Sequence, residues 1–261
     1  MRWITAGGAV TGPAHRHAGR SCEDAFQVIP CPGLLMAAVA DGAGSAPRAA
    51  DGAACVVSAA CAAISAWQAT YGAVQTVAEI TDEVAYGWLA SVRSAVEARA
   101  LADNCPLGDL SATGLFLVAD ASGVLAIQVG DGGIAVRSPA GGWSPLTWPL
   151  RGEYANETVF LTSDEWRATA QVVRAGPCAA VALFSDGFEV LALNYRERRV
   201  NAHLLDPLAD YLRDVAPGLG AAQADLDAAM IGYLTNPTFD EHAFDDRTLV
   251  LGCFVPAGSG A

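Results

Sequence analysis

The chain has 261 residues, 52% of them hydrophobic, which is enough to bury a large core without disulfides or a structural metal. Its formal net charge is -13, and every basic residue is an arginine. An acidic surface repels polyanions, so nucleic acid and anionic membranes are excluded as favoured partners. The seven cysteines form no Cys-x-x-Cys pair, which argues against a zinc site or a disulfide framework and predicts a cytoplasmic protein.

The first half of the chain predicts strands followed by helices. Short strands are predicted at residues 3–10 and 24–29, separated by a polar, turn-rich loop over residues 11–21. The apolar run at residues 34–40 predicts a buried strand that ends at Asp41-Gly42. Alanine-rich stretches at residues 47–71 and 74–103 predict two helices with a break at Gly72. The longest apolar stretch, residues 53–66, is too short to predict a membrane span.

The second half predicts mainly strands. Residues 124–129 and 134–137, joined by Asp131-Gly132-Gly133, have the pattern of a β-hairpin. The other predicted strands are 112–118, 157–161, 170–174, 179–184 and 248–255, and the predicted helices are 200–215 and 221–234. Because strands do not alternate singly with helices, we predict a mainly antiparallel, layered α+β domain over residues 1–256 and a flexible tail at 257–261.

Acidic residues stand where the predicted apolar strands begin or end. They are Glu23, Asp24, Asp41, Asp131, Asp186, Asp245 and Asp246. A carboxylate at the mouth of a buried strand is unfavourable unless it is neutralised, and converging carboxylates repel one another unless a divalent cation lies among them. Ligand sets made only of oxygen select Mg²⁺, Mn²⁺ or Ca²⁺. A single Asp-Gly pair is usually a turn, so the metal hypothesis requires several of these acids to meet in space.

Six short stretches occur in the order typical of one enzyme family. They are residues 23–25, 39–45, 111–113, 129–132, 184–188 and 245–248. On these stretches the chain resembles the PPM-type, or type 2C, metal-dependent Ser/Thr phosphatases. The segment from Gly12 to Phe26 and the stretch Asn156-Glu157-Thr158 are similar to the compact bacterial branch of that family. The resemblance implies a four-layer α-β-β-α sandwich, in which two antiparallel sheets are flanked by pairs of antiparallel helices.

The resemblance also implies an activity and a metal site. The activity is hydrolysis of phosphoserine or phosphothreonine in proteins by a water activated between two Mg²⁺ or Mn²⁺ ions. The substrate implied by analogy is a Ser/Thr kinase or its target, within bacterial signalling. Asp41 would bridge the two ions, with the Gly42 carbonyl on one of them and Asp24 acting directly or through waters. The remaining implied ligands are Glu23 beside Asp24, Asp186, Asp245 and, for a third and weaker ion, Asp131.

Several positions depart from the family pattern or leave alternatives open. The acid that usually follows Asp186 by four residues is replaced by Val190, which disfavours a third ion; the adjacent Glu189 is predicted to point elsewhere. Asp245 aligns with the usual ligand, whereas Asp246 stands where the family often has asparagine.

The residue that binds the phosphate is also open. Arg20 is one residue short of the usual spacing for the phosphate-binding arginine, so Arg16, Arg20 and His15 all remain candidates. His15 or a metal-bound water would protonate the leaving group.

Two other kinds of protein fit parts of the sequence. A catalytically weak or inactive phosphatase-like regulatory or binding module would keep the fold and lose the metals. A Ca²⁺-binding structural protein is disfavoured, because the acids are scattered along the chain and not gathered in one loop.

Overall fold

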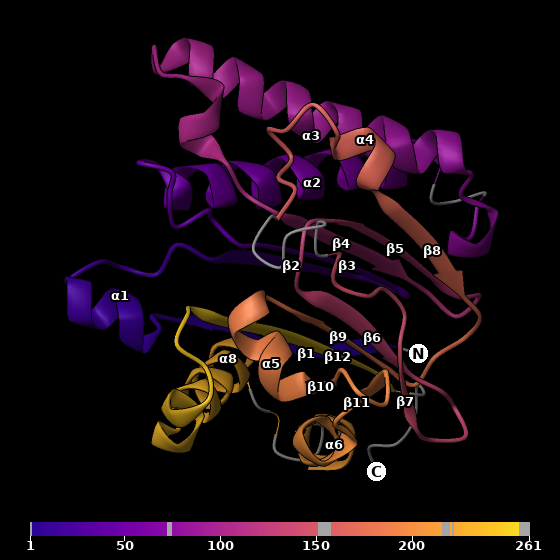
Figure 1. Ribbon diagram of the computed structural model, residues 1–261. Coiled ribbons are helices and arrows are strands. Elements are labelled where there is room, and N and C mark those ends of the chain that lie inside the picture. The colour runs from indigo at the N-terminus through magenta and orange to yellow at the C-terminus, as the bar shows by residue number, and fades with distance from the viewer. Residues whose placement is uncertain (1, 72–74, 151–157, 216–219, 221, 256–261) are drawn as a thin grey trace.

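The computed structural model describes residues 2–71, 75–150, 158–215, 220 and 222–255 (Figure 1). The predicted helix break at Gly72, the Asn156-Glu157 pair and the predicted tail lie outside the described residues.

Two antiparallel sheets of five strands each are stacked face to face in the described part of the chain. In order across the first sheet, the strands are β1 (Arg2–Val10), β12 (Arg247–Val255), β9 (Ala180–Phe184), β6 (Gly133–Arg137) and β7 (Trp143–Pro145). In order across the second sheet, they are β2 (Ala25–Cys31), β3 (Leu34–Ala40), β4 (Gly114–Ala119), β5 (Val124–Val129) and β8 (Gln171–Ala175). A two-stranded ribbon, β10 (Leu193–Asn194) with β11 (Arg199–Val200), lies outside both sheets.

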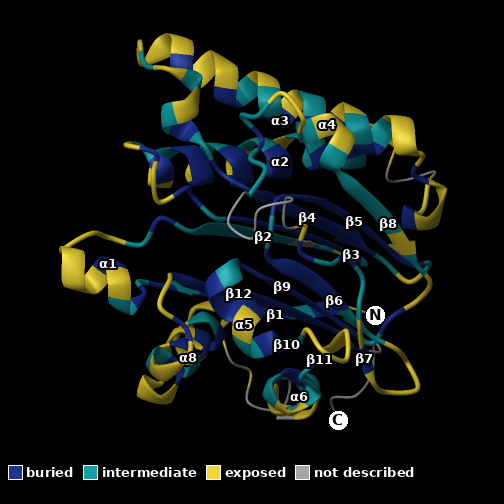
Figure 2. Cartoon of the chain, viewed as in Figure 1, coloured by how far each residue is buried: buried dark blue, intermediate teal, exposed yellow. Residues whose placement is uncertain are grey.

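Helices cover both outer faces, which confirms the predicted α-β-β-α sandwich (Figure 1). The second sheet is covered by α2 (Ala49–Tyr71) and α3 (Asp82–Ala102), with the short α4 (Trp166–Thr169), η1 (Val77–Glu79) and η2 (Leu107–Leu110) nearby. The first sheet is covered by α5 (Asp186–Ala192), α6 (Ala202–Asp210), its π-helical continuation η3 (Tyr211–Val215), α8 (Gln223–Leu234) and η4 (Pro237–Glu241). Buried residues fill the space between the sheets and under each helical layer (Figure 2).

Helix α2 is long and apolar enough to cross a membrane by length and composition alone, contrary to the prediction for this stretch. One of its faces is buried against the second sheet, where Ala53, Val56 and Ala60 join the same cluster as Met36 and Ala38 of β3. The helix therefore acts as the core helix of the upper layer in Figure 1.

The structure corrects three sequence-based predictions. Strands β5 and β6 do not form a hairpin, because they belong to different sheets; Gly130 and Gly132, at φ 96° and 82°, carry the chain across. The loop predicted at residues 11–21 contains a short helix, α1 (Pro13–Ala18), which starts at a proline and ends at Gly19 in the left-handed region. Residues 158–161 are not a strand; the rest of that predicted element lies outside the described chain.

Candidate metal centre

The register of the second sheet places two predicted acids side by side. Ala25, the first residue of β2, pairs with Ala40, the last residue of β3. Asp24 directly precedes the first strand and Asp41 directly follows the second, so both lie at the same edge of the sheet. The charge of Asp24 is among the causes that raise the pKa of Asp41. The two predicted acids are therefore neighbours at this edge of the sheet.

The register of the first sheet brings three more acids to the facing edge. Phe184 at the end of β9 pairs with Gly133 at the start of β6 and with Leu249 near the start of β12. The acids that flank these strand ends are Asp131 before β6, Asp186 after β9 and Asp245 before β12.

Four of the five acids line one small cavity. The cavity has a volume of about 130 Å³. It is lined by Asp41, Gly42, Ala43, Gly44, Asp131, Thr158, Phe160, Asp186 and Asp245. Asp24 is not among the lining residues, but it interacts with Asp41, which is. We call this feature the acidic cavity.

Asp24 joins the two sheets beside the acidic cavity. Its Oδ2 atom accepts hydrogen bonds from the hydroxyls of Ser185 at 2.6 Å and Thr248 at 2.7 Å; Thr248 belongs to β12 of the other sheet, and Ser185 directly follows β9 of that sheet. Its Oδ1 atom is buried and has no hydrogen-bond partner among the described residues. Burial raises the pKa of Asp24 to about 6, although these two hydroxyls act in the opposite direction.

Asp41 and Asp186 are destabilised as anions in this setting. Burial raises the pKa of Asp41 well above its usual value, and repulsion from Asp24 and Asp186 raises it further. Burial likewise raises the pKa of Asp186, with repulsion from Asp131 and Asp245 as the next causes. The Asp186 Oδ1 atom is buried without a hydrogen-bond partner in the described structure.

This donor set fits hard divalent cations. Carboxylate oxygens that lack hydrogen-bond donors and repel one another are relieved when a divalent cation lies between them. The acidic cavity offers only oxygen ligands from its acids and backbone, as Mg²⁺ and Mn²⁺ prefer.

Gly42 is required where the loop after β3 enters the cavity. A Cβ atom at this position would lie 2.6 Å from the Ala49 carbonyl oxygen and 2.8 Å from the Glu23 carbonyl oxygen. Asp41 is fixed on the other side, because its N–H donates to Thr113 Oγ1 at 3.0 Å. The close packing brings the Gly42 backbone into the cavity wall, where its carbonyl can serve as a ligand.

The structure separates the roles of the adjacent Asp245 and Asp246. Asp245 is exposed and lines the acidic cavity. Asp246 is only 1% exposed. Its carboxylate accepts hydrogen bonds from the Gly12 N–H at 2.7 Å, the Glu23 N–H at 2.6 Å and the ring of His15 at 2.9 Å. Asp246 therefore links the β1–α1 connection and the Glu23-Asp24 segment to the start of β12. Of the two acids, Asp245 is the one whose carboxylate is available to bind a cation.

Replacing Asp246 with asparagine should lower the free energy of unfolding by about 2 kcal/mol, because the amide cannot accept from all three buried donors. Metal affinity should fall as well, since the Glu23-Asp24 segment loses an anchor. Denaturant unfolding and calorimetric metal titration would measure both effects. An unchanged unfolding midpoint would contradict this account of Asp246.

The three phosphate-binding candidates lie in different environments. His15 is buried and its Nδ1 is hydrogen-bonded to Asp246, which accounts for the grouping of His15, Asp245 and Asp246 ligand atoms within 4.8 Å. Arg16 turns away to bind Asp240 and the Thr11 carbonyl. Arg20 is half-exposed.

Arg20 is the candidate that borders the acidic cavity. It binds Glu23 and donates to the carbonyl of Gly44, a lining residue, at 3.2 Å. Glu23 is buried and lies between two basic side chains: one carboxylate oxygen binds Arg20, and the other, Oε2, lies 3.8 Å from His15 Nε2. This Oε2 atom has no hydrogen-bond partner in the described part of the chain. Glu23 therefore supports Arg20, and it is absent from the cavity lining.

The prediction that Glu189 points elsewhere is wrong. Residues 186–192 form helix α5, and in a helix the residue three positions after Asp186 lies on the same side. Glu189 is fully buried, and its Oε2 accepts the Gly132 N–H at 2.7 Å, next to Asp131. Its charge is among the causes that raise the pKa of Asp186. Val190, in contrast, is 45% exposed.

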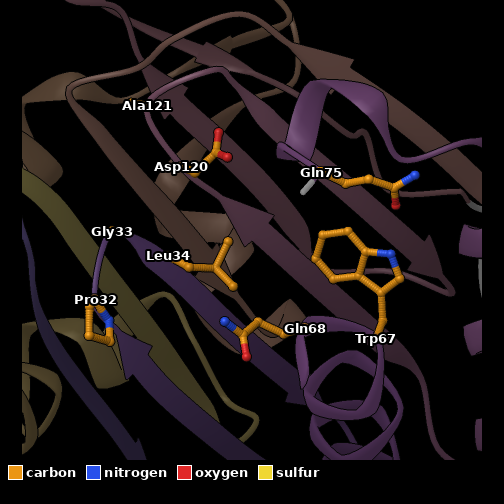
Figure 3. A pocket seen from close by; sticks show the side chains of 8 residues that line it. All are labelled: Pro32, Gly33, Leu34, Trp67, Gln68, Gln75, Asp120 and Ala121. Carbon is orange, nitrogen blue, oxygen red and sulfur yellow. The ribbon is translucent and has the colours of Figure 1, made fainter. Parts of the chain in front are cut away.

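A second cavity, of about 220 Å³, lies at the opposite end of the second sheet (Figure 3). It is bordered by Leu34, where β3 starts, whereas Asp41 follows the end of that strand. Its one carboxylate among the described lining residues, Asp120, accepts backbone N–H groups of Val77 and Ser122. That side chain holds a turn, so the metal chemistry belongs to the acidic cavity.

Sequence reasoning assigned no role to several residues that build the site. Ser185 and Thr248 hold Asp24, Thr113 holds the Asp41 backbone, and Thr158 donates to Asp131 Oδ2 at 2.7 Å. The sequence indicates them only by position. Ser185 and Thr248 are hydroxyl residues within three positions of a strand-end acid, and Thr113 lies inside one of the six family stretches.

Comparison with known proteins places these observations in a family context. The family model described as protein phosphatase 2C matches residues 11–231. Serine/threonine-protein phosphatase 3 of Escherichia coli (strain K12) is 32% identical over 265 residues, covering 98% of this chain and 100% of the relative. The second match extends past Asp245, so it includes all the strand ends that carry the acids.

Solved structures show a likeness in fold. The catalytic domain of the serine threonine protein phosphatase PstP, in complex with 2 manganese ions, has a TM-score of 0.62 at 14% identity, covering 98% of this chain and 99% of that one. A bacterial serine phosphatase has a TM-score of 0.58 at 14% identity, with coverage of 95% and 96%.

Proposed function

Since the chain belongs to the protein phosphatase 2C family, we propose that it removes phosphate from serine and threonine side chains of proteins with two Mg²⁺ or Mn²⁺ ions. The chain is a metal-dependent protein phosphatase, and its substrates are phosphoproteins. The observation that carries the two-ion proposal is the convergence of acids from both sheets on one cavity.

Four of the five acids have a proposed place in the metal site. Asp41 interacts with acids of both sheets and would bridge the ions, and the Gly42 carbonyl would bind one of them. Asp24 approaches from the second sheet, and Asp186 and Asp245 approach from the first. The ions would supply a water of lowered pKa and would neutralise charge on the phosphoryl oxygens.

The chain's own residues orient the substrate in this proposal. Arg20, half-exposed at the cavity wall, binds the phosphate; Glu23 keeps its guanidinium in place. His15 stays a positioning residue, because its ring is buried and bonded to Asp246. A solvent water then protonates the leaving alkoxide.

The function is tested by following hydrolysis of p-nitrophenyl phosphate and of phosphoserine, phosphothreonine and phosphotyrosine peptides, with Mn²⁺, with Mg²⁺ and in excess chelator. We expect hydrolysis that requires either ion and that favours the serine and threonine peptides. Full activity in chelator would overturn the two-ion proposal. Tight metal binding without hydrolysis would favour the inactive regulatory module instead.

We further propose a single domain over residues 1–256, a cytoplasmic location, a signalling role and a Ser/Thr kinase or its target as substrate. The seven cysteines, all free and described, support a reducing compartment.

A further inference from the structure

Phe244 is an exposed aromatic residue directly before a cavity acid. Its side chain is 66% exposed, although a phenylalanine gains most from burial. The next residue is Asp245, which lines the acidic cavity. Isolated exposed apolar residues are common, so exposure alone does not indicate a role. The position at the cavity rim is the feature that needs an explanation.

The backbone around Phe244 is held firmly at this rim. The Phe244 carbonyl accepts the Ala14 N–H at 3.0 Å, which ties it to the start of α1. A Cβ atom added at Gly12 would lie 2.1 Å from the Asp245 carbonyl oxygen, and one at Gly187 would lie 3.1 Å from its carbonyl carbon. The segment is therefore packed between the β1–α1 connection and the first turn of α5, so the backbone that carries the exposed ring is fixed in position.

Val190 adds a second apolar group on the neighbouring helix. It lies one turn after Gly187 on α5, the helix whose first turn contacts the Asp245-Asp246 backbone, and it is 45% exposed. Phe244 and Val190 are thus two exposed apolar residues on segments whose backbones touch, and each segment also carries a cavity acid, Asp245 or Asp186. Arg20 adjoins the cavity at a different lining residue, Gly44.

A phosphoprotein substrate must cross this rim. Adjacent Cα atoms are about 3.8 Å apart, so a residue next to the phosphorylated one lies within reach of the residue next to Asp245. On the basis of the proposed function, we propose that Phe244, assisted by Val190, selects substrates that carry an apolar side chain immediately beside the phosphorylated residue. Arg20 binds the phosphate, and Phe244 contacts the apolar side chain of the neighbouring residue.

The test compares phosphothreonine peptides that carry leucine or serine immediately before or immediately after the phosphorylated residue, with p-nitrophenyl phosphate as the substrate without neighbours. Wild-type enzyme should show a five- to tenfold higher kcat/KM for leucine at one of these positions, in the range expected for one partly buried apolar side chain. Phe244→Ala should reduce that preference to below about twofold, and Val190→Ser should reduce it by a smaller factor.

Three controls separate this inference from the proposed function. Hydrolysis of p-nitrophenyl phosphate should be unchanged in Phe244→Ala, and Phe244→Leu should keep most of the preference. Tyr71→Ala removes an aromatic of similar exposure, 48%, at the far end of α2 and should keep all of it. This inference is overturned if the enzyme hydrolyses all peptides without a preference for leucine, or if the preference survives Phe244→Ala. Either result leaves the proposed function standing. No hydrolysis of any substrate overturns both.

Discussion

Replacing Asp41 with asparagine should lower kcat for phosphate ester hydrolysis by about 10³-fold. Asp41 lines the cavity and interacts with acids of both sheets, among them Asp24 and Asp186. Its removal leaves the ions without their shared ligand, and the electrostatic contribution of a catalytic metal is several kcal/mol, or about three powers of ten in rate. The measurement is steady-state hydrolysis of p-nitrophenyl phosphate at saturating Mn²⁺.

The same substitution should stabilise the metal-free protein. Burial and neighbouring charges raise the pKa of Asp41, so its charged form is unfavourable in the folded state at neutral pH. A neutral asparagine of the same shape removes that cost and should raise the unfolding midpoint in chelator. Asp164→Asn, at an exposed position where the described structure gives the carboxylate no hydrogen bond or ion pair, is the matched control and should change neither property. An active Asp41→Asn enzyme would rule out the assignment.

Saturating Mn²⁺ should raise the free energy of unfolding at pH 8 by about 4 kcal/mol when its concentration is a thousand times the dissociation constant. The gain arises because the ion binds the converged acids of the folded protein and not the scattered acids of the unfolded chain. Thermal unfolding with Mn²⁺ and with excess chelator measures it. A melting temperature that chelator leaves unchanged would contradict the two-ion site.

The metal-free protein should also gain stability as the pH falls from 8 to about 5.5. The pKa of Asp24 is raised to about 6 by burial, and the pKa values of Asp41 and Asp186 are raised further above their usual range. The folded state therefore holds more protons than the unfolded state in this window, so stability is lost as the pH rises through the folded pKa values. With Mn²⁺ bound, the dependence should weaken or reverse, because protons then compete with the ions.

The strand ends were the most predictable part of this molecule. Leu34–Ala40 is apolar throughout because it is buried on both faces, so this strand is visible as an unbroken run. Val124–Val129 is buried along its whole length as well, and Gln128 is its one polar residue. The acids that follow such runs have no place in a core, which is why Asp41 and Asp186 could be identified before their surroundings were known.

Features that depend on long-range pairing could not be predicted in the same way. The turn at Asp131-Gly132 has the local composition of a hairpin, but strand pairing is decided by the whole sheet, and here the chain crosses to the other sheet. Asp245 and Asp246 are chemically identical, and the resemblance alone favoured Asp245 as the ligand; the three donors that surround Asp246 supply the physical reason. The orientation of Glu189 depended on whether residues after Asp186 continue as a loop or as a helix.

Strand β12 has a consequence for the order of events during synthesis. It is the last of the described strands, yet it pairs with β1 on one side and β9 on the other, inside the first sheet. A nascent chain in which this segment has not yet been synthesised has a gap in that sheet and lacks Asp245 as well as the Thr248 hydroxyl that holds Asp24. Dephosphorylation therefore requires that β12 be synthesised and inserted between two strands that precede it in the chain.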